Sequence, residues 1–205
     1  MKRILLSMAV GLSCFSAQAE TQAPDAMIKD VAQEVIVIIK QDAGSKAENQ
    51  KKILALVDAR VLPNFDFTHM TQLAVGRYWK QATPEQQKAL VAEFRNMLVR
   101  TYANALSLYR DQKIEVRPVK MNAGDKEVVV NTRIIKSSGQ PTLVDYKMEK
   151  EADGWKVYDV VIEAVSLVTN YRGQFATTIQ QSGIDGLIKE LSGMNAGSVR
   201  KADAK

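Results

Sequence analysis

The sequence is poor in the residues that carry most enzyme chemistry and most metal binding. It contains one cysteine, Cys14, and one histidine, His69. A zinc site built from histidine and cysteine therefore lacks ligands. A catalytic triad would have to pair His69 with Asp66, one helical turn away, where a solvated or capping role is more common. No glycine-rich phosphate loop follows a predicted strand. We therefore expect no catalytic residue and no metal site.

Long hydrophobic runs are also scarce. The apolar segment near the start, residues 4–15, is too short to span a bilayer and follows the positive pair Lys2 and Arg3. The small residues Ala17 and Ala19 come next, in the spacing of a cleavage site. Together these features predict that residues 1–19 are a cleaved signal peptide and that the mature protein is exported in soluble form.

Cleavage would remove the only cysteine, so the mature protein has no disulfide and its core alone must hold the fold. Without Lys2 and Arg3, the 28 basic residues become 26 against 23 acidic ones, which leaves a net charge of +3. The charges are interspersed along the chain, so this balance does not indicate nucleic-acid binding. The remaining chain is long enough for one domain with a sizeable core.

Helical periodicity dominates the first half of the chain. The predicted helices span roughly residues 25–39, 47–61, 66–76 and 84–110. The last of these has the strongest signals, because Thr83 is a suitable N-cap, Pro84 fits the first helical position and Gln86 completes a capping box. Its apolar face is long enough to cross a small domain. We expect this helix to form a wall of any internal cavity.

The second half changes to strand periodicity and then returns to helix. Glycine-containing turns separate runs rich in β-branched residues at 112–119, 127–136, 141–150 and 154–163. Their short connections predict an antiparallel meander. Helices are predicted at 166–181 and 184–192, followed by a flexible basic tail at 193–205. Residues 20–192 should thus form a single α+β domain, with several helices packed on a four-stranded antiparallel sheet.

Carboxylates on the predicted strands keep an enzyme open as an alternative. Asp145 and Glu149 alternate with an apolar row and should face solvent. Asp159 lies on a strand that is apolar on both faces, where we predict a structural ion pair with Arg133. A proton-transfer role for Asp159 is the alternative, since perturbed buried acids often mark active sites.

The run WKVYDVVIEAVSLVTNYRGQF, residues 155–175, and three further blocks resemble the MlaC family, also called toluene-tolerance auxiliary proteins. The other blocks are PNFDF at 63–67 followed by Met70, GRYW at 76–79 running into ATPEQ at 82–86, and GIDGL at 183–187. They cover nearly the whole mature chain in family order. Ala164 stands where many members of the family carry glycine.

This resemblance implies a fold, a function and partners. The implied fold is a nuclear-transport-factor-like cone with an internal apolar cavity. The implied function is that of a soluble carrier in the Gram-negative periplasm, which shuttles phospholipid between the outer membrane and an inner-membrane ABC-transporter complex and so maintains outer-membrane lipid asymmetry. The implied partners are an inner-membrane lipid-transfer domain protein and an outer-membrane lipoprotein–porin complex. The lipid is cargo, no cofactor is expected, and the protein should be a monomer.

A carrier of this kind must shelter acyl chains, because roughly thirty methylenes at ~0.8 kcal/mol each would cost more than about 20 kcal/mol in water. We expect the chains to lie between helix 84–110 and the sheet. The expected apolar lining is Leu98, Tyr102, Leu106, Val144, Tyr146, Met148, Tyr158, Val160, Leu167, Tyr171 and Phe175. Candidate headgroup contacts are Arg77, Lys147 and Arg172, for which a plain surface charge is the alternative. A cone-fold isomerase or dehydratase, and a periplasmic adaptor or chaperone without lipid, are the competing functions.

Overall fold

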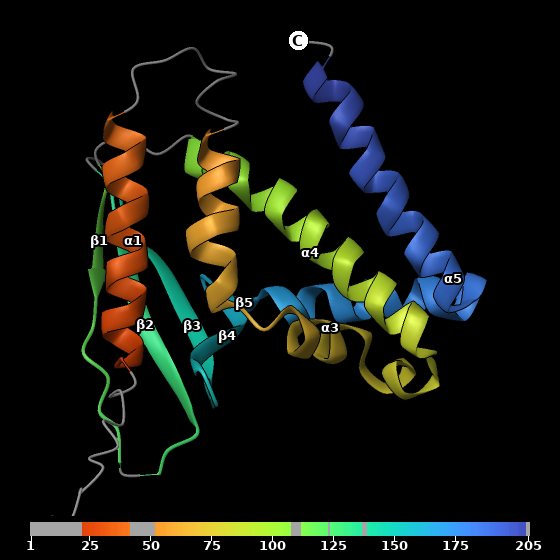
Figure 1. Ribbon diagram of the computed structural model, residues 1–205, viewed down its shortest axis with the longest axis horizontal. Coiled ribbons are helices and arrows are strands. Elements are labelled where there is room, and N and C mark those ends of the chain that lie inside the picture. Colours follow the sequence, from red (N-terminus) through yellow and green to blue (C-terminus); the bar gives the residue numbers. More distant parts are fainter. Residues whose placement is uncertain (1–21, 42–51, 108–111, 123, 137–138, 204–205) are drawn as a thin grey trace, which may run out of the picture.

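The computed structural model describes residues 22–41, 52–107, 112–122, 124–136 and 139–203, so the predicted signal peptide lies outside it. The first half contains α1 (Pro24–Gln41), a helical stretch at 52–56, η1 (Val57–Val61), η2 (Leu62–Asn64), α3 (Phe67–Val75), η3 (Gly76–Gln81) and α4 (Pro84–Ser107). The second half contains β1 (Lys113–Val116), β2 (Glu127–Ile135), β3 (Thr142–Glu151), β4 (Gly154–Ile162), β5 (Val165–Ser166) and α5 (Leu167–Asp203). In Figure 1, α1 stands in front of the sheet, while α3, α4 and α5 extend to one side of it. No helix within the described residues has both the length and the apolar character needed to cross a membrane.

The predicted helix boundaries are confirmed where they rest on capping residues. The Asp66 carboxylate accepts a hydrogen bond from the His69 backbone N–H at 2.9 Å and caps α3. Gly76 ends that helix with φ 59°, a left-handed conformation that glycine adopts without strain. At the start of α4, Thr83 and Gln86 each accept a hydrogen bond from the other's backbone N–H, at 3.2 and 3.0 Å. This is the reciprocal capping box that the sequence predicts.

Within the described residues, the sheet has five strands rather than four. It is antiparallel throughout, in the order β1-β2-β3-β4-β5. The strand that the sequence missed, β5, pairs with β4 after a turn made by Glu163 and Ala164, with φ 48° and 65°. Tight hairpin turns with positive φ usually contain asparagine or glycine. Because Glu163 and Ala164 carry no such signal, the extra strand was not predicted.

The last helix is longer than predicted. The predicted break between two helices is confirmed at Gly183, which has φ 73°, but helical structure continues to Asp203, through most of the predicted flexible tail. Asn195 is buried against α4, where its side-chain amide donates to the Glu93 carbonyl at 3.1 Å. Arg100 donates to the Asn195 carbonyl at 2.6 Å. These contacts anchor the beginning of the segment that we expected to be mobile.

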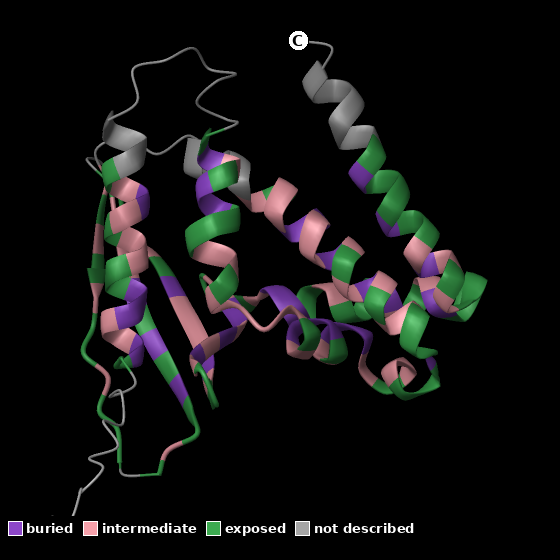
Figure 2. Cartoon of the chain, in the orientation of Figure 1, coloured by how far each residue is buried: buried purple, intermediate pink, exposed green. Residues whose placement is uncertain are grey.

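Among the residues whose side chains are described, the buried apolar ones form two clusters (Figure 2). We call one the helical core, and it consists of Met70, Ala74, Val75, Ala82, Leu90, Phe94, Met97, Leu98, Val168, Phe175, Ile179, Leu187 and Leu191. We call the other the sheet core, and it consists of Met27, Ile28, Val128, Val130, Val144, Met148, Trp155, Val157, Val160 and Leu167. The partly buried rings of Phe65 and Tyr102 pack against both. The two cores therefore meet at these aromatic side chains.

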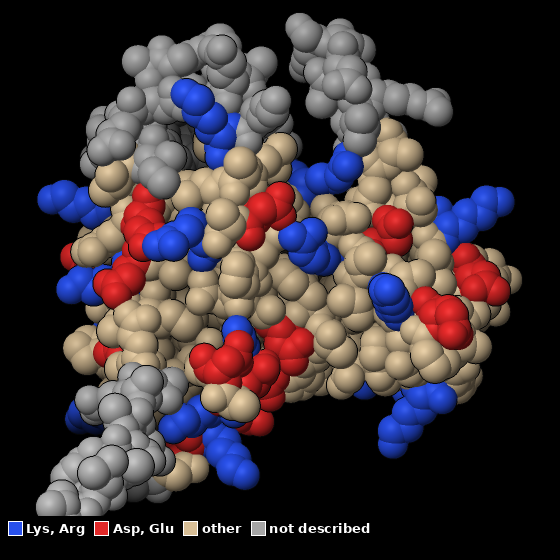
Figure 3. Space-filling model, viewed as in Figure 1, with Lys and Arg blue, Asp and Glu red and all other residues tan. Residues whose placement is uncertain are grey.

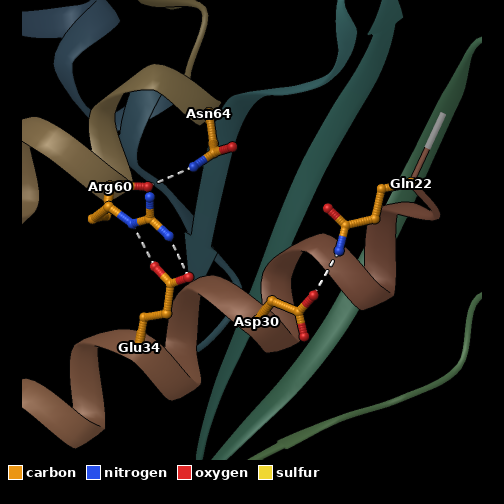
Figure 4. Close-up of polar contacts among 5 residues, drawn as sticks. All are labelled: Gln22, Asp30, Glu34, Arg60 and Asn64. Atoms are coloured by element: carbon orange, nitrogen blue, oxygen red, sulfur yellow. Dashed lines mark hydrogen bonds and ion pairs between the residues drawn. The ribbon is translucent and has the colours of Figure 1, made fainter. Parts of the chain in front are cut away.

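Polar contacts between α1 and η1 hold the N-terminal helix in place (Figure 4). The Arg60 guanidinium donates two hydrogen bonds to the Glu34 carboxylate, at 2.6 and 2.5 Å, and these bonds lower the pKa of Glu34. Asn64 donates to the Arg60 carbonyl at 2.7 Å. The pair is solvent-exposed, so it orients α1 more than it stabilises the fold.

Candidate functional site: the apolar interior

The inner face of the sheet carries an apolar row that strand alternation predicts. Side chains from β2 and β3 face one another in the pairs Val128–Met148, Val130–Tyr146 and Thr132–Val144. Thr132 is the polar member, and its hydroxyl donates to the Val144 carbonyl at 2.7 Å. The sheet can therefore present an apolar surface without leaving that buried hydroxyl unpaired.

A β-bulge changes which residues of β4 face inward. Lys147 pairs with Asp159 and Met148 with Val157, so Tyr158 is the extra residue between them. Such a bulge reverses the alternation that follows it. Trp155 and Val157 before it, and Val160 after it, all belong to the sheet core. The Tyr158 ring instead stacks on His69, with centroids 4.8 Å apart.

The inner face of the sheet is tightly closed at one end and less closed at the other. We call the region around Met148 and Val157 the closed end, where both side chains have no accessible surface. The region around Ile114, Ile134 and Ile162 is the open end, where all three side chains are only partly buried. Because apolar side chains gain by complete burial, the open end leaves apolar surface that a ligand could cover.

Tyr146 lies between these two ends, opposite Val130 on one side and Val160 on the other. Burial raises the pKa of its phenol to about 12. The side chain nevertheless keeps some accessible surface. Tyr146 therefore lies at the edge of the incompletely covered part of this face, which we take as the candidate hollow.

A pocket of ≈ 390 Å³ adjoins the open end, between α1 and β1. It falls in the size range of small-molecule sites. Its walls are Lys29, Ala32, Gln33 and Ile36 from one stripe of α1, and residues 114–118 from β1 and the following turn. The sequence analysis did not assign these residues to a site. The helical spacing of residues 29, 32, 33 and 36 was the available signal.

The structure divides the predicted lining residues between the two cores. Val144, Tyr146, Met148, Val160 and Leu167 lie in or against the sheet core. Leu98, Tyr171 and Phe175 lie in or against the helical core, and Tyr102 contacts both cores. Tyr158 packs on His69 instead. Leu106 lies outside the residues whose side chains the structure describes.

Within the helical core, the predicted residues pack on one another. The rings of Phe94, Tyr171 and Phe175 lie 5.1–5.6 Å apart. Those separations are typical of aromatic pairs in solid cores. Phe175 and Leu98 are also almost completely buried. This aromatic cluster is therefore packed as a core, whereas the partly buried Tyr102 lies where the two cores meet.

Each predicted headgroup residue has a contact within the protein. The Arg77 guanidinium lies 5.0 Å over the Tyr78 ring and donates to its hydroxyl at 3.0 Å. Arg172 lies against Gly76, so closely that a Cβ atom there would be 3.1 Å from the guanidinium Nε. Lys147 pairs with a buried carboxylate on the neighbouring strand. None of the three is among the described residues that line the pocket.

The predicted pairing of Asp159 with Arg133 is wrong. The buried Asp159 carboxylate instead accepts a hydrogen bond from the Ser166 hydroxyl at 2.7 Å and one from the Val168 N–H at 3.3 Å. Lys147 lies 3.1 Å from the same carboxylate. The sequence could not give this arrangement, because it depends on the bulge and on β5. These contacts fasten β4 to the start of α5, which favours a structural role over proton transfer.

The two remaining carboxylates also have partners. Asn131 donates to Asp145 at 2.8 Å across the outer face of the sheet. Glu149 does not face open solvent as predicted, because the His69 side chain of α3 contacts it. It is half-buried, 2.5 Å from the His69 ring nitrogen Nδ1.

Comparison with known proteins assigns the family. The family model described as "MlaC protein" matches residues 29–193. The toluene tolerance protein ttg2D of Pseudomonas putida is 27% identical over 203 residues, 98% of this chain and 92% of that protein. The intermembrane phospholipid transport system binding protein MlaC of Haemophilus influenzae is 25% identical over 179 residues, 86% of this chain and 83% of that protein.

A solved structure agrees with this assignment. The phospholipid-binding protein from Ralstonia solanacearum, determined in complex with a phospholipid, superposes with a TM-score of 0.79. It is 38% identical to this chain, and the match covers 87% of this chain and 99% of that one. The α+β fold and the family resemblance expected from the sequence are thus confirmed, and the chain belongs to the MlaC family.

Proposed function

We propose that this protein is a soluble carrier, which binds phospholipid as its cargo and carries it across the periplasm. One observation carries the proposal: the fold matches, at 38% identity, a protein that was solved with a phospholipid bound. The partly accessible apolar side chains at the open end of the sheet support it. So does the pocket next to them, between α1 and β1.

We propose a binding mode from the partly accessible side chains around the open end. Acyl chains would enter beside the open end, lie over Ile134 and Ile162, and reach Tyr146 and Tyr102. Each buried methylene contributes ~0.8 kcal/mol, so a hollow of this kind competes with a bilayer for the lipid. Lys29 and Arg117 lie in the wall of the pocket, where they can offset a phosphate charge more directly than Arg77, Lys147 or Arg172.

The place of action and the partners are part of the proposal. The predicted signal peptide at residues 1–19 would direct the chain to the periplasm. There it would exchange lipid with an inner-membrane lipid-transfer domain protein of an ABC transporter and with an outer-membrane lipoprotein–porin complex. The relative named as a binding protein of an intermembrane phospholipid transport system supports this. We propose no chemical transformation of the lipid.

Native mass spectrometry of the mature protein, taken directly from the periplasm, tests the function. We expect a protein–phospholipid complex. An Ile134→Glu variant would place a carboxylate in the acyl path, and because an unpaired buried charge is costly its lipid content should fall roughly tenfold or more. Circular dichroism should show that the variant is folded.

Val129→Glu is the matched control, since Val129 lies on the same strand but is 47% exposed on the outer face. It should keep its lipid. If the wild-type protein carries no lipid and extracts none from vesicles of phosphatidylethanolamine and phosphatidylglycerol, the carrier proposal is wrong. An empty protein with a protein partner would favour an adaptor or chaperone. An empty protein that converts a small substrate would favour the cone-fold enzyme.

A further inference from the structure

The start of α3 and the end of β3 bring together three side chains that can ligate a metal. Asp66 caps α3, His69 lies in its first turn, and Glu149 lies on β3, 80 residues away in the sequence. A main-chain hydrogen bond from the Asp66 N–H to the Val157 carbonyl, at 3.0 Å, docks this end of α3 on β4. One ligand atom from each of the three side chains lies within 4.8 Å of the other two.

This geometry is close to what a tetrahedral ion requires. Zinc binds histidine nitrogen and carboxylate oxygen at about 2.0–2.2 Å, so its ligand atoms lie about 3.3–3.6 Å apart. Opening the His69–Glu149 contact from 2.5 Å by roughly 1 Å, with a similar closure toward Asp66, would create the site. The His69 and Glu149 side chains are 27% and 25% exposed, which leaves room for a water as the fourth ligand.

The charge of the cluster also fits a divalent cation. Two carboxylates and a neutral imidazole carry a charge of −2. Two further acids lie nearby in the chain, Glu151 at the end of β3, two residues after Glu149, and Asp153 in the turn that follows. Acidic side chains gather on this face of the molecule, close to the ends of β3 and β4 (Figure 3). Lys156 offsets part of this charge, but it is itself paired with Asp153 at 2.9 Å.

We propose that Asp66, His69 and Glu149 bind a divalent transition-metal ion of the zinc class. The histidine nitrogen favours such an ion over Mg²⁺ or Ca²⁺, which prefer oxygen ligands. The low histidine and cysteine counts exclude only zinc sites whose ligands are all histidine or cysteine. The proposed site takes two of its three protein ligands from carboxylates. The ion would replace the His69–Glu149 contact and clip α3 to β3. Since α3 contributes Met70 to the helical core and β3 contributes Met148 to the sheet core, the ion would tie the two cores together.

Titration of the full mature chain with Zn²⁺, after removal of any affinity tag and dialysis against a chelator, tests the site. Isothermal calorimetry should show one zinc per protein, with much weaker binding of Mg²⁺. His69→Gln and Glu149→Gln should each weaken zinc affinity at least roughly tenfold. Asp145→Asn is the matched control, because Asp145 lies on the same strand and is paired with Asn131. It should bind zinc as the wild type does.

A second measurement does not depend on the variants. His69 is the only histidine in the chain, so one set of imidazole ring signals appears in the NMR spectrum. Those signals should shift on adding one equivalent of zinc. If they do not move, or if His69→Gln binds zinc as tightly as the wild type, the site does not exist. Neither outcome bears on the lipid-carrier proposal, because the cluster lies outside the hollow.

Discussion

The two ends of the sheet's inner face use the same kinds of side chain and differ in how completely these are covered. At the closed end, Met148 and Val157 have no accessible surface, and Phe65 pairs with Val157 as a short parallel extension of the sheet. At the open end, Ile134 and Ile162 keep part of their surface accessible, and the pocket between α1 and β1 lies next to them. Apolar composition alone therefore does not distinguish a core from a binding surface.

The comparison separates residues that hold the fold from residues that are available to a ligand. A side chain with solid packing on all sides loses contacts when it is shortened. A side chain beside a hollow loses fewer, because part of its surface has no protein partner. The closed end should therefore determine stability, and the open end should determine lipid content.

The largest effect is expected at the closed end. Met148→Ala should lower the free energy of unfolding by about 2–5 kcal/mol, because it removes a fully buried side chain and leaves a cavity. Ile134→Ala, at the open end, should cost less, about 1.5–2 kcal/mol in the lipid-free protein, because it removes three carbons at ~0.8 kcal/mol each from a side chain that is only partly buried. Urea unfolding of the two delipidated variants measures the difference. Equal losses would show that the open end is packed as solidly as the closed end.

A smaller effect is expected at Tyr146, on the boundary between the two ends. Burial raises the pKa of its phenol to about 12, from an ordinary value of 10.0. Above pH 10 the unfolded chain loses this proton first, so stability should fall between pH 10 and pH 12, by roughly 2 kcal/mol. Below pH 10 the phenol is protonated in both states and this effect is absent. The difference between the ultraviolet titration curves of the wild type and of Tyr146→Phe gives the titration of this phenol alone.

Lipid removal sharpens this measurement. Burial by the protein alone already raises the pKa of Tyr146, so acyl chains that cover its remaining accessible surface should raise the pKa further. Its titration should therefore lie at higher pH in the loaded protein than in the lipid-free one. Tyr78 supplies an internal contrast, since hydrogen bonds from Arg77 and Gln180 lower its pKa and it packs against the helical core. Its titration should not respond to lipid. An unchanged Tyr146 titration on delipidation would place the hollow elsewhere.

Much of the fold could be predicted because its signals are local. The caps at Asp66 and Thr83, the glycine at 76 and the alternation along β2 and β3 each depend on neighbouring residues. The family resemblance supplied the expected function, which periodicity could not. The residues predicted to line the cavity belong to both cores. Alternation identifies the inner face of a strand, but it does not show whether a ligand or another side chain covers that face.

The predictions that failed depend on non-local geometry. The bulge at Tyr158 changes which residues of β4 point inward, so Asp159 pairs with Lys147 rather than with Arg133. Glu149 was predicted to face solvent, because the sequence of its own strand does not show that His69 of α3 contacts it. The pocket beside α1 was missed because its walls are 78 or more residues apart in the sequence, from Ile36 to Ile114. Contacts of this kind follow from the assembled fold rather than from any single segment.

The smallest predicted effect concerns the turns at the two ends of β4. At the closed end the β3–β4 turn places Gly154 at φ 137°, whereas at the open end the β4–β5 turn places Ala164 at φ 65°. A residue with a Cβ atom in the left-handed region destabilises the folded state by roughly 1–2 kcal/mol relative to glycine. Glycine loses more conformational entropy on folding, which offsets part of this advantage. Ala164→Gly should therefore raise the free energy of unfolding by about 0.5–1 kcal/mol. Gly154→Ala is the converse change and should destabilise the protein. If Ala164→Gly also lowers lipid retention while it raises stability, the stiffness of this turn contributes to holding the open end in shape; if retention is unchanged, the turn affects folding alone.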